Sequence, residues 1–262
     1  MRAFASLLAA SFALAGAAEA APRRVASLNL CTDELLLALG DPRQIVSVTH
    51  LAQRKEETPY WSLARRYRKN DGSLLAVAPL RPDLLLTMGG GGRDRIGIAG
   101  RLGVRVLDLP YPQNLQDIKK ALGQVSAALG RPNAGRKAIA EIERLERSRP
   151  KEQRDTIWLG GGGRTVAVPS LAAEWMALAG FRQRSLGVDK VTLEQLLVSP
   201  PGILLRSDYR IGEYSGEQRW LRHPLARGTR RSRTIPTDGR AWTCMGPAMI
   251  EEVKRLRTKV HA

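Results

Sequence analysis

The chain has 262 residues, with 42 lysines and arginines against 25 aspartates and glutamates, and a formal net charge of +17 at pH 7. A charge of this size attracts polyanions. Nucleic acid is nevertheless excluded as the expected partner, because the chain carries no nucleic-acid-binding motif and residues 1–20 resemble an export signal. An anionic small ligand or an anionic membrane surface fits the charge better.

Residues 1–20 predict a cleavable signal peptide. Arg2 supplies the positive start, residues 4–15 are mostly apolar, and Ala18-Glu19-Ala20 gives the small-residue pattern that precedes a cut before Ala21. Neither cysteine follows the cut, so no lipid anchor is expected. No later run approaches 18 apolar residues. We therefore expect a soluble monomer that is secreted into the periplasm.

Short apolar runs then alternate with helical patterns. The first half predicts strands at residues 25–30, 45–49, 84–88 and 104–109, and helices at residues 32–39, 73–78 and 93–102. The second half predicts strands at residues 156–159, 203–206 and 233–237, and helices at residues 170–179, 192–198 and 247–259. This alternation is typical of the α/β class, in which helices cover both faces of a mostly parallel sheet.

The middle of the chain departs from this alternation, because two helices follow each other without a strand between them. Ile118, Leu122, Val125 and Leu129 share one helical face. Residues 132–148 then predict one helix of roughly 25 Å. This helix is either a stiff bridge or an ordinary surface helix, and we favour the bridge. The expected parts are an N-terminal lobe at 21–111, a helical segment at 112–150 and a C-terminal lobe at 151–262.

One phrase occurs twice, once in each expected lobe. An apolar strand ends in four glycines and an arginine at residues 84–93, and again at residues 157–164. Glycine allows another molecule to approach the main chain closely, and ligands of open α/β sheets lie outside the carboxyl ends of the strands. The alternative is a pair of unrelated loops. The candidate ligand contacts in these loops are Gly90, Gly91, Gly161 and Gly162.

Further phrases follow one another along the mature chain. They are Arg24-Val25-Ala26-Ser27-Leu28 with Thr32-Asp33-Glu34-Leu35, then Leu80-Arg81-Pro82-Asp83-Leu84-Leu85-Leu86, then Leu102-Gly103-Val104-Arg105-Val106. Behind a signal peptide and ahead of a long helix, this series resembles the periplasmic substrate-binding proteins of ABC importers for vitamin B12, ferric siderophores and haem. The resemblance implies two Rossmann-like lobes bridged by a single long α-helix, a ligand in the cleft, little hinge closure, and delivery to a permease without catalysis.

Members of that family usually place a glutamate on each lobe tip, where arginines of the permease bind the pair. Here the N-terminal position corresponds to Arg93, and the C-terminal position lies near Thr243. Asp94, Glu213 and Glu217 are the candidate substitutes for docking an ABC permease in the inner membrane. The departure leaves open a second function, a non-transport interaction or sensing protein on the same scaffold.

Other candidates fall in the predicted loops at strand ends. Trp242 offers a flat ring to stack on a macrocycle or chelate, unless it packs in the core; Trp61 and Tyr209 are weaker candidates. Arginine side chains in these loops would neutralise a carboxylate or an anionic ferric chelate, unless they lie on exposed surface. The arginines in question are Arg93, Arg206, Arg210 and Arg240.

Cys31 and Cys244 fall in loops of opposite lobes, and both are candidate ligand contacts. Exported proteins often pair their cysteines, and a disulfide here would tie the lobes together across the opening and hinder ligand entry. Free thiols would instead bind a soft metal or the cobalt of a corrinoid, or act as the nucleophile of a hydrolase. His50 is a candidate axial ligand to haem or cobalt, although a lone histidine is more often a polar loop residue. Only three histidines are present, so a zinc carrier is not expected.

No enzyme signature is present. The glycine loops lack the lysine and hydroxyl residue of a P-loop and differ from the dinucleotide-binding fingerprint. The sequence therefore predicts a binding protein with no catalytic residue, no resident metal and no cofactor. Its expected ligand is a metal chelate, either a ferric siderophore or a corrinoid, with haem as the alternative.

Overall fold

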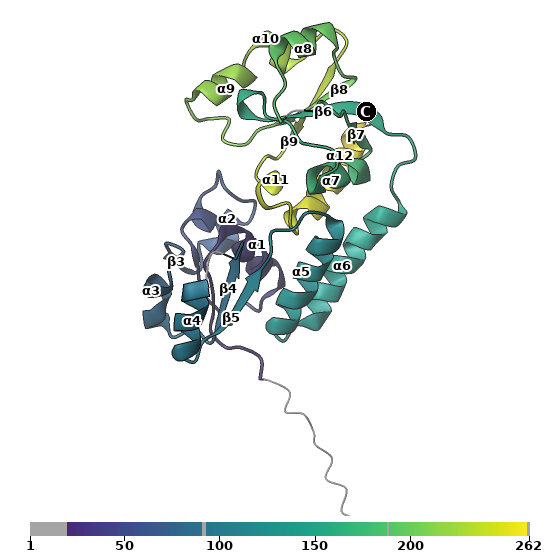
Figure 1. The fold of residues 1–262 in the computed structure, drawn as a ribbon. Helices are drawn as coiled ribbons and strands as arrows, with labels where there is room; N and C mark the ends of the chain where they lie inside the picture. The colour runs from purple at the N-terminus through teal and green to yellow at the C-terminus, as the bar shows by residue number, and fades with distance from the viewer. Residues whose placement is uncertain (1–19, 91–92, 188, 261–262) are drawn as a thin grey trace, which may run out of the picture.

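Two parallel sheets form the two lobes of the molecule, the N-terminal one below and the C-terminal one above in Figure 1. The computed structural model describes residues 20–90, 93–187 and 189–260, and for residues 93–96 it describes the backbone alone. The predicted signal peptide, apart from Ala20, lies outside these residues. Within the described ranges, no helix combines the length and apolar character of a membrane span.

The N-terminal sheet has the strand order β3-β2-β1-β4-β5, and every pair is parallel. Apolar side chains bury α3 and α4 against one face and α1 against the other. The strands are β1 (Val25–Ser27), β2 (Ile45–Thr49), β3 (Arg68–Asn70), β4 (Leu84–Met88) and β5 (Arg105–Leu109). The helices are α1 (Leu30–Leu39), α2 (Trp61–Ala64), α3 (Leu74–Val77) and α4 (Arg93–Arg101), with 3₁₀ turns η1 (Leu51–Gln53) and η2 (Ala78–Leu80).

The C-terminal sheet has the order β7-β6-β8-β9, again with every pair parallel. One face carries α7 and α12, and the other carries α8, α9 and α10. The strands are β6 (Arg154–Leu159), β7 (Phe181–Gln183), β8 (Ile203–Ser207) and β9 (Arg233–Thr237). The helices are α7 (Leu171–Ala179), α8 (Leu193–Val198), α9 (Gly216–Leu221), α10 (Pro224–Arg227), α11 (Ala241–Cys244) and α12 (Ala248–Val260), with the 3₁₀ turn η3 (Gly161–Gly163).

Two helices connect the lobes: α5 (Leu115–Ala128) and α6 (Pro132–Arg147), which lie side by side in Figure 1. Near its start, α6 fits closely on α5, because a side chain at Gly135 would collide with Ser126. Toward its end, α6 reaches the C-terminal lobe: Lys254 pairs with Glu141 at 3.1 Å, and Arg257 donates to the Leu145 carbonyl at 2.8 Å. The predicted bridging helix therefore joins the C-terminal lobe to α5, and α5 in turn packs on α1 of the N-terminal lobe.

The start of α1 differs from the sequence expectation of a cap at Thr32 or Asp33. Asn29 caps the helix, and its side chain accepts from the Cys31 amide at 2.8 Å. Asp33 is instead buried against β2, where its carboxylate accepts from the Thr49 amide at 3.1 Å. The helix consequently begins two residues earlier and brings Cys31 into its first turn.

The elements missed from the sequence are short. β3 and β7 have three residues each, and both are edge strands. Two of the three residues in β3 are Arg68 and Lys69, so no apolar alternation marks the strand. α2, α10 and α11 have four residues each and α9 has six, which is too short for a helical repeat of apolar positions to show.

A disulfide between Cys31 and Cys244 joins the two lobes, with Cα atoms 5.2 Å apart. Both thiols are consumed. The two alternatives that required a free thiol, soft-metal ligation and a cysteine nucleophile, are therefore wrong. Around the bond, a buried apolar cluster continues from Leu30 and Leu35 in α1 to Trp242 and Met249 in the other lobe. The lobes are thus covalently linked and share a core.

We expect the disulfide to supply a large part of the stability. It closes a segment with a sequence separation of 213 residues, and the chain-entropy model gives about 5 kcal/mol for a loop of this length. The double replacement Cys31→Ser with Cys244→Ser should lower the free energy of unfolding by about 3–5 kcal/mol in urea titrations. A reductant should lower the wild-type value similarly and leave the variant unchanged. Equal urea midpoints for the oxidised wild type and the variant would contradict this expectation.

Two adjacent acids on α1 are fully buried next to the joint between the lobes. Asp33 bonds to Thr49, and the Glu34 carboxylate accepts from the Thr58 hydroxyl at 2.6 Å through Oε1, while Oε2 has no partner. Burial raises the pKa of Asp33 to about 7 and that of Glu34 to about 8, and the charges of Asp33 and Asp238 add to the effect on Glu34. Both carboxyls therefore hold protons in the folded protein that an unfolded chain has already released.

Stability should therefore depend on pH in a defined direction. The stability that these carboxyls contribute is fully present below the pKa values that they have in the unfolded chain, and it is lost as the pH rises through their higher pKa values in the folded protein. The free energy of unfolding should therefore fall between about pH 5 and pH 8. Each group contributes up to about 1.4 kcal/mol per pH unit. In urea titrations across this range, Glu34→Gln should gain stability relative to wild type as pH rises. The exposed control Glu152→Gln should not, and a pH-independent offset for Glu34→Gln would refute the assignment.

Candidate ligand-binding site

Two polar links join the facing ends of the sheets, in addition to the disulfide. Glu57, at 3% exposure, accepts hydrogen bonds from the Tyr209 hydroxyl at 2.7 Å and from the Arg210 guanidinium. Burial and the bond to Glu57 raise the pKa of Tyr209, which keeps its hydroxyl protonated as the donor. Arg240 donates to the Lys55 carbonyl at 3.2 Å. These contacts connect the segment before α2 to the loops after β8 and β9.

A cavity of about 780 Å³ lies next to the disulfide, between the lobes. Its walls come from the end of β4, from segments that follow β1 and β5 in one lobe, and from segments that follow β6 and β9 in the other, including the first turns of α1 and α7. Ligands of open parallel sheets bind at these strand ends. We call it the disulfide-side cavity. It is lined by Cys31, Met88, Tyr111, Pro112, Gln113, Asn114, Val166, Ala167, Pro169, Ser170, Leu171, Ala172, Glu174, Thr243, Cys244 and Met245.

Most polar groups of the disulfide-side cavity are already hydrogen-bonded. Glu174 accepts from the Leu115 amide at 2.7 Å, and Asn114 caps α5. Tyr111, in contrast, is 57% exposed, and its hydroxyl forms no hydrogen bond with the described residues. The cavity therefore offers a mainly apolar wall with one free phenol, a composition common in sites for small organic ligands.

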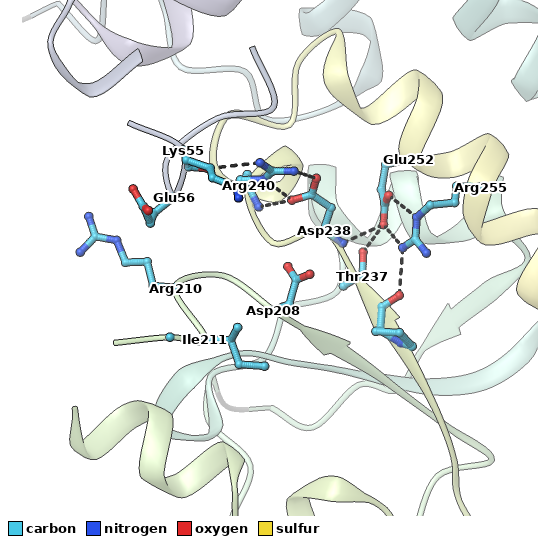
Figure 2. A pocket seen from close by; sticks show the side chains of 12 residues that line it. Lys55, Glu56, Asp208, Arg210, Ile211, Thr237, Asp238, Arg240, Glu252 and Arg255 are labelled. Atoms are coloured by element: carbon cyan, nitrogen blue, oxygen red, sulfur yellow. Dashed lines mark hydrogen bonds and ion pairs between the residues drawn. The ribbon is translucent and has the colours of Figure 1, made fainter. Parts of the chain in front are cut away.

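A second cavity, of about 630 Å³, lies between Lys55 and the loops after β8 and β9 (Figure 2). Figure 2 shows Arg240 between Lys55 and Asp238, and the guanidinium bonds to both oxygens of Asp238, at 2.8 and 2.6 Å. Arg255 is paired in the same way with Glu252. Because each of these guanidinium groups already has a carboxylate, neither is free to neutralise an anionic chelate as the sequence suggested for Arg240.

At most of the described glycines in the two loops, the space that a side chain would fill is occupied by other residues of the protein. A side chain at Gly89 would lie within about 2.5 Å of the Tyr111 ring. Side chains at Gly161 and Gly162 would meet Glu217 of α9. Gly90 has a φ of +67° and open space around it, and Gly91 lies outside the described residues. Gly89, Gly161 and Gly162 do allow another group to come close to the main chain, as the sequence indicated. The groups that come close, however, are Tyr111 and α9 of the same protein, and no ligand is needed to explain these glycines.

The predicted aromatic and imidazole ligands are placed away from the disulfide-side cavity. Trp242 is 7% exposed, its Nε1 donates to the Thr237 hydroxyl at 2.6 Å, and its ring centre lies 5.9 Å from that of Trp158. His50 is exposed, with Nδ1 3.2 Å from the Asn70 carbonyl oxygen. Trp61 lies at the start of α2, with the Arg65 guanidinium 6.0 Å from its ring centre.

The charged candidates are also dispersed. The side chains of Arg93 and Asp94 lie outside the description. Arg206 is half-buried on β8, where burial and the charge of Arg227 lower its pKa. Glu213 pairs with Arg210 at 3.4 Å, and Glu217 with Arg164 at 3.5 Å. Of the ligand contacts predicted from the sequence, the structure places Cys31 and Cys244 on the disulfide-side cavity, as a disulfide.

Met88 and Met245 belong to two strand-end segments, residues 88–93 and 238–246, that the sequence predicts as walls of the cleft, and both line this cavity. Sequence reasoning missed Tyr111, which follows a predicted strand, and Val166, which lies in an irregular segment. Nothing in their local pattern shows that they face one another. Among the described residues, no three His, Cys, Asp or Glu side chains form a metal site.

Comparison with solved structures found proteins whose overall fold is similar to that of this chain. A periplasmic haem-binding protein from Pseudomonas aeruginosa is 18% identical, with 91% of this chain and 92% of that one covered and a TM-score of 0.65. The vitamin B12 binding protein BtuF of Vibrio cholerae is 18% identical, with 92% and 97% covered and a TM-score of 0.63. The siderophore-binding protein BauB, bound to two acinetobactin molecules and ferric iron, is 14% identical, with 91% and 94% covered and a TM-score of 0.68.

These structures share the fold with the present chain. A search of curated protein sequences gave no match. The model of the periplasmic binding protein family, however, matches residues 25–175, more than half of the chain. Together with the two parallel sheets and the helix that bridges them, this match shows that the chain belongs to the periplasmic binding protein family.

Proposed function

We propose that this protein captures a metal chelate, a ferric siderophore or a corrinoid, in the disulfide-side cavity and carries it to an ABC importer. The observation that carries the proposal is the position of the cavity, whose walls come from strand-end loops of both sheets. Its volume of about 780 Å³ lies within the usual range for small-ligand sites. The mainly apolar wall suits the organic periphery of a chelate.

The similar structures support this ligand class, since those proteins bind haem, vitamin B12 and a ferric siderophore. The predicted signal peptide and the disulfide support secretion into the periplasm, because disulfides persist in oxidising compartments. A carrier role calls for neither catalysis nor a resident cofactor. The protein is proposed to act as a monomer, without a nucleic-acid partner.

Haem is the alternative ligand, and the lining of the cavity favours it. The Tyr111 phenol, which has no hydrogen-bond partner among the described residues, lines the cavity together with Met88 and Met245. Phenolate and thioether are both known axial ligands of haem iron. Haemin bound through Tyr111 would show an absorbance spectrum that changes in Tyr111→Phe, whereas cobalamin or siderophore binding would not require the hydroxyl.

Filling the cavity should weaken ligand binding. Ala167 is exposed and lines the cavity, so Ala167→Trp would occupy space that the ligand needs. We expect at least about tenfold weaker binding of whichever probe the wild type binds. The matched control is Leu75→Trp, at a position 83% exposed on α3, which should bind like wild type. The measurement is equilibrium dialysis against haemin, cyanocobalamin and ferric siderophores.

Two outcomes would overturn the proposal. Wild-type protein that binds none of the three probes is not a carrier of this ligand class. Equal binding by Ala167→Trp and Leu75→Trp would place the ligand elsewhere.

Docking to the permease is proposed to use Asp94, Glu213 or Glu217 in place of the usual glutamates. Glu217 is the most accessible of the described pair, with 59% of its side chain exposed and a loose contact to Arg164. Glu217→Gln should leave ligand affinity unchanged and reduce stimulation of the permease's ATPase in proteoliposomes. If loaded wild-type protein does not stimulate the ATPase at all, the non-transport sensing function becomes the better account.

A further inference from the structure

Five arginines form an exposed surface on the outer side of the C-terminal lobe. They lie on α9, on α10 and in the turn before β9, on the face of the sheet that carries α8, α9 and α10. We call this surface the arginine face. Its members are Arg219, Arg222, Arg227, Arg230 and Arg231, all exposed.

The charge of the arginine face is not neutralised from within the chain. None of the five pairs with a carboxylate of the described residues, and the only acidic residue in segment 216–231 is Glu217, whose partner is Arg164. By contrast, Arg240 and Arg255 on the inter-lobe side each hold a carboxylate. Within the described residues, the arginine face thus carries positive charge without ion pairs, unlike Arg240 and Arg255 on the inter-lobe side.

A buried atom beneath the face adds to this imbalance. Arg206 on β8 is half-buried, and its Nε is buried with no hydrogen-bond partner in the part of the chain that the structure describes. The positive charge of the nearby Arg227 repels the Arg206 guanidinium. The negative charge of Asp208 offsets this repulsion in part. An external anion at this face would relieve that repulsion.

Exposed apolar side chains accompany the arginines. Leu197 is 61% exposed and Val198 is 82% exposed at the end of α8, which packs against α10. Basic residues beside exposed aliphatic ones suit a surface that is anionic at its headgroups and apolar just beneath. A hydrophilic polyanion would leave the two aliphatic side chains in water.

We propose that the arginine face binds the surface of a bilayer rich in anionic phospholipid. The five guanidinium groups are spread over two helices and a turn, so an extended array of phosphates offers each one a partner. Leu197 and Val198 enter the boundary between headgroups and acyl chains. The attraction is electrostatic and weakens as salt shortens the Debye length.

The test is sedimentation of the full mature protein with vesicles of equimolar phosphatidylglycerol and phosphatidylcholine, and with vesicles of phosphatidylcholine alone. Wild type should bind the anionic vesicles, bind them less at high salt, and not bind the neutral ones. The triple variant Arg227→Gln, Arg230→Gln, Arg231→Gln should lose at least about tenfold in partition coefficient. A control of equal charge loss on α5 and α6, Lys120→Gln, Arg136→Gln, Lys137→Gln, should change it by less than about twofold, because those residues lie off the face.

Three outcomes overturn the proposal. They are failure of wild type to bind the anionic vesicles, equal losses in the two triple variants, which would indicate net charge alone, and binding of inorganic polyphosphate by the arginines without vesicle binding. Chelate affinity should be unchanged in both triple variants, so these results are independent of the proposed carrier function.

Discussion

The disulfide between Cys31 and Cys244 is the constraint on which the geometry of the molecule depends. It ties the first turn of α1 to α11 across the joint between the lobes. Glu57 adds a buried polar link to Tyr209 and Arg210 in the same interface. The two walls of the disulfide-side cavity are therefore held at a fixed separation before any ligand arrives. A cavity formed in advance loses less conformational entropy on binding than one that must be assembled from mobile lobes.

That same interface determines what kind of ligand the lobes can hold. Its guanidinium groups are already occupied, Arg210 by Glu57 and Arg240 by Asp238. An anionic ligand would have to compete with these internal carboxylates, at a cost in desolvation on both sides. Neither arginine lines the disulfide-side cavity, where recognition is expected to rest on apolar contact and on the phenol of Tyr111. Charge on the ligand would be directed toward the open solvent side.

The sequence predicted the strands at 45–49, 84–88 and 233–237 with the bounds that the structure has. The first two are short, mostly apolar runs between turn residues, whereas the third has one buried aliphatic side chain, Ile235. The sequence also predicted the alternation of the longer strands and helices and the long helix at mid-chain, but not the short elements β3, β7, α2, α9, α10 and α11. The sequence did not show whether the cysteines pair across the lobes, because Cys31 and Cys244 are separated by 213 residues. A disulfide and a pair of free thiols were both chemically sound. Glycine was equally ambiguous: the sequence shows that something comes close to Gly89, but only the fold shows that it is Tyr111.

The distribution of charge separates two surfaces of the C-terminal lobe that a net charge of +17 does not distinguish. β8 illustrates the division within a single strand, because alternate side chains of a strand point to opposite faces. Leu205 faces the core shared with the other lobe, whereas Leu204 packs under α8, α9 and α10. Arg206, on the same face as Leu204, lies near Arg227 instead of near the ligand cavity. The proposed attraction of this outer face to an anionic surface would therefore leave the disulfide-side cavity, whose one charged lining residue is Glu174, to select its ligand by shape and apolar contact.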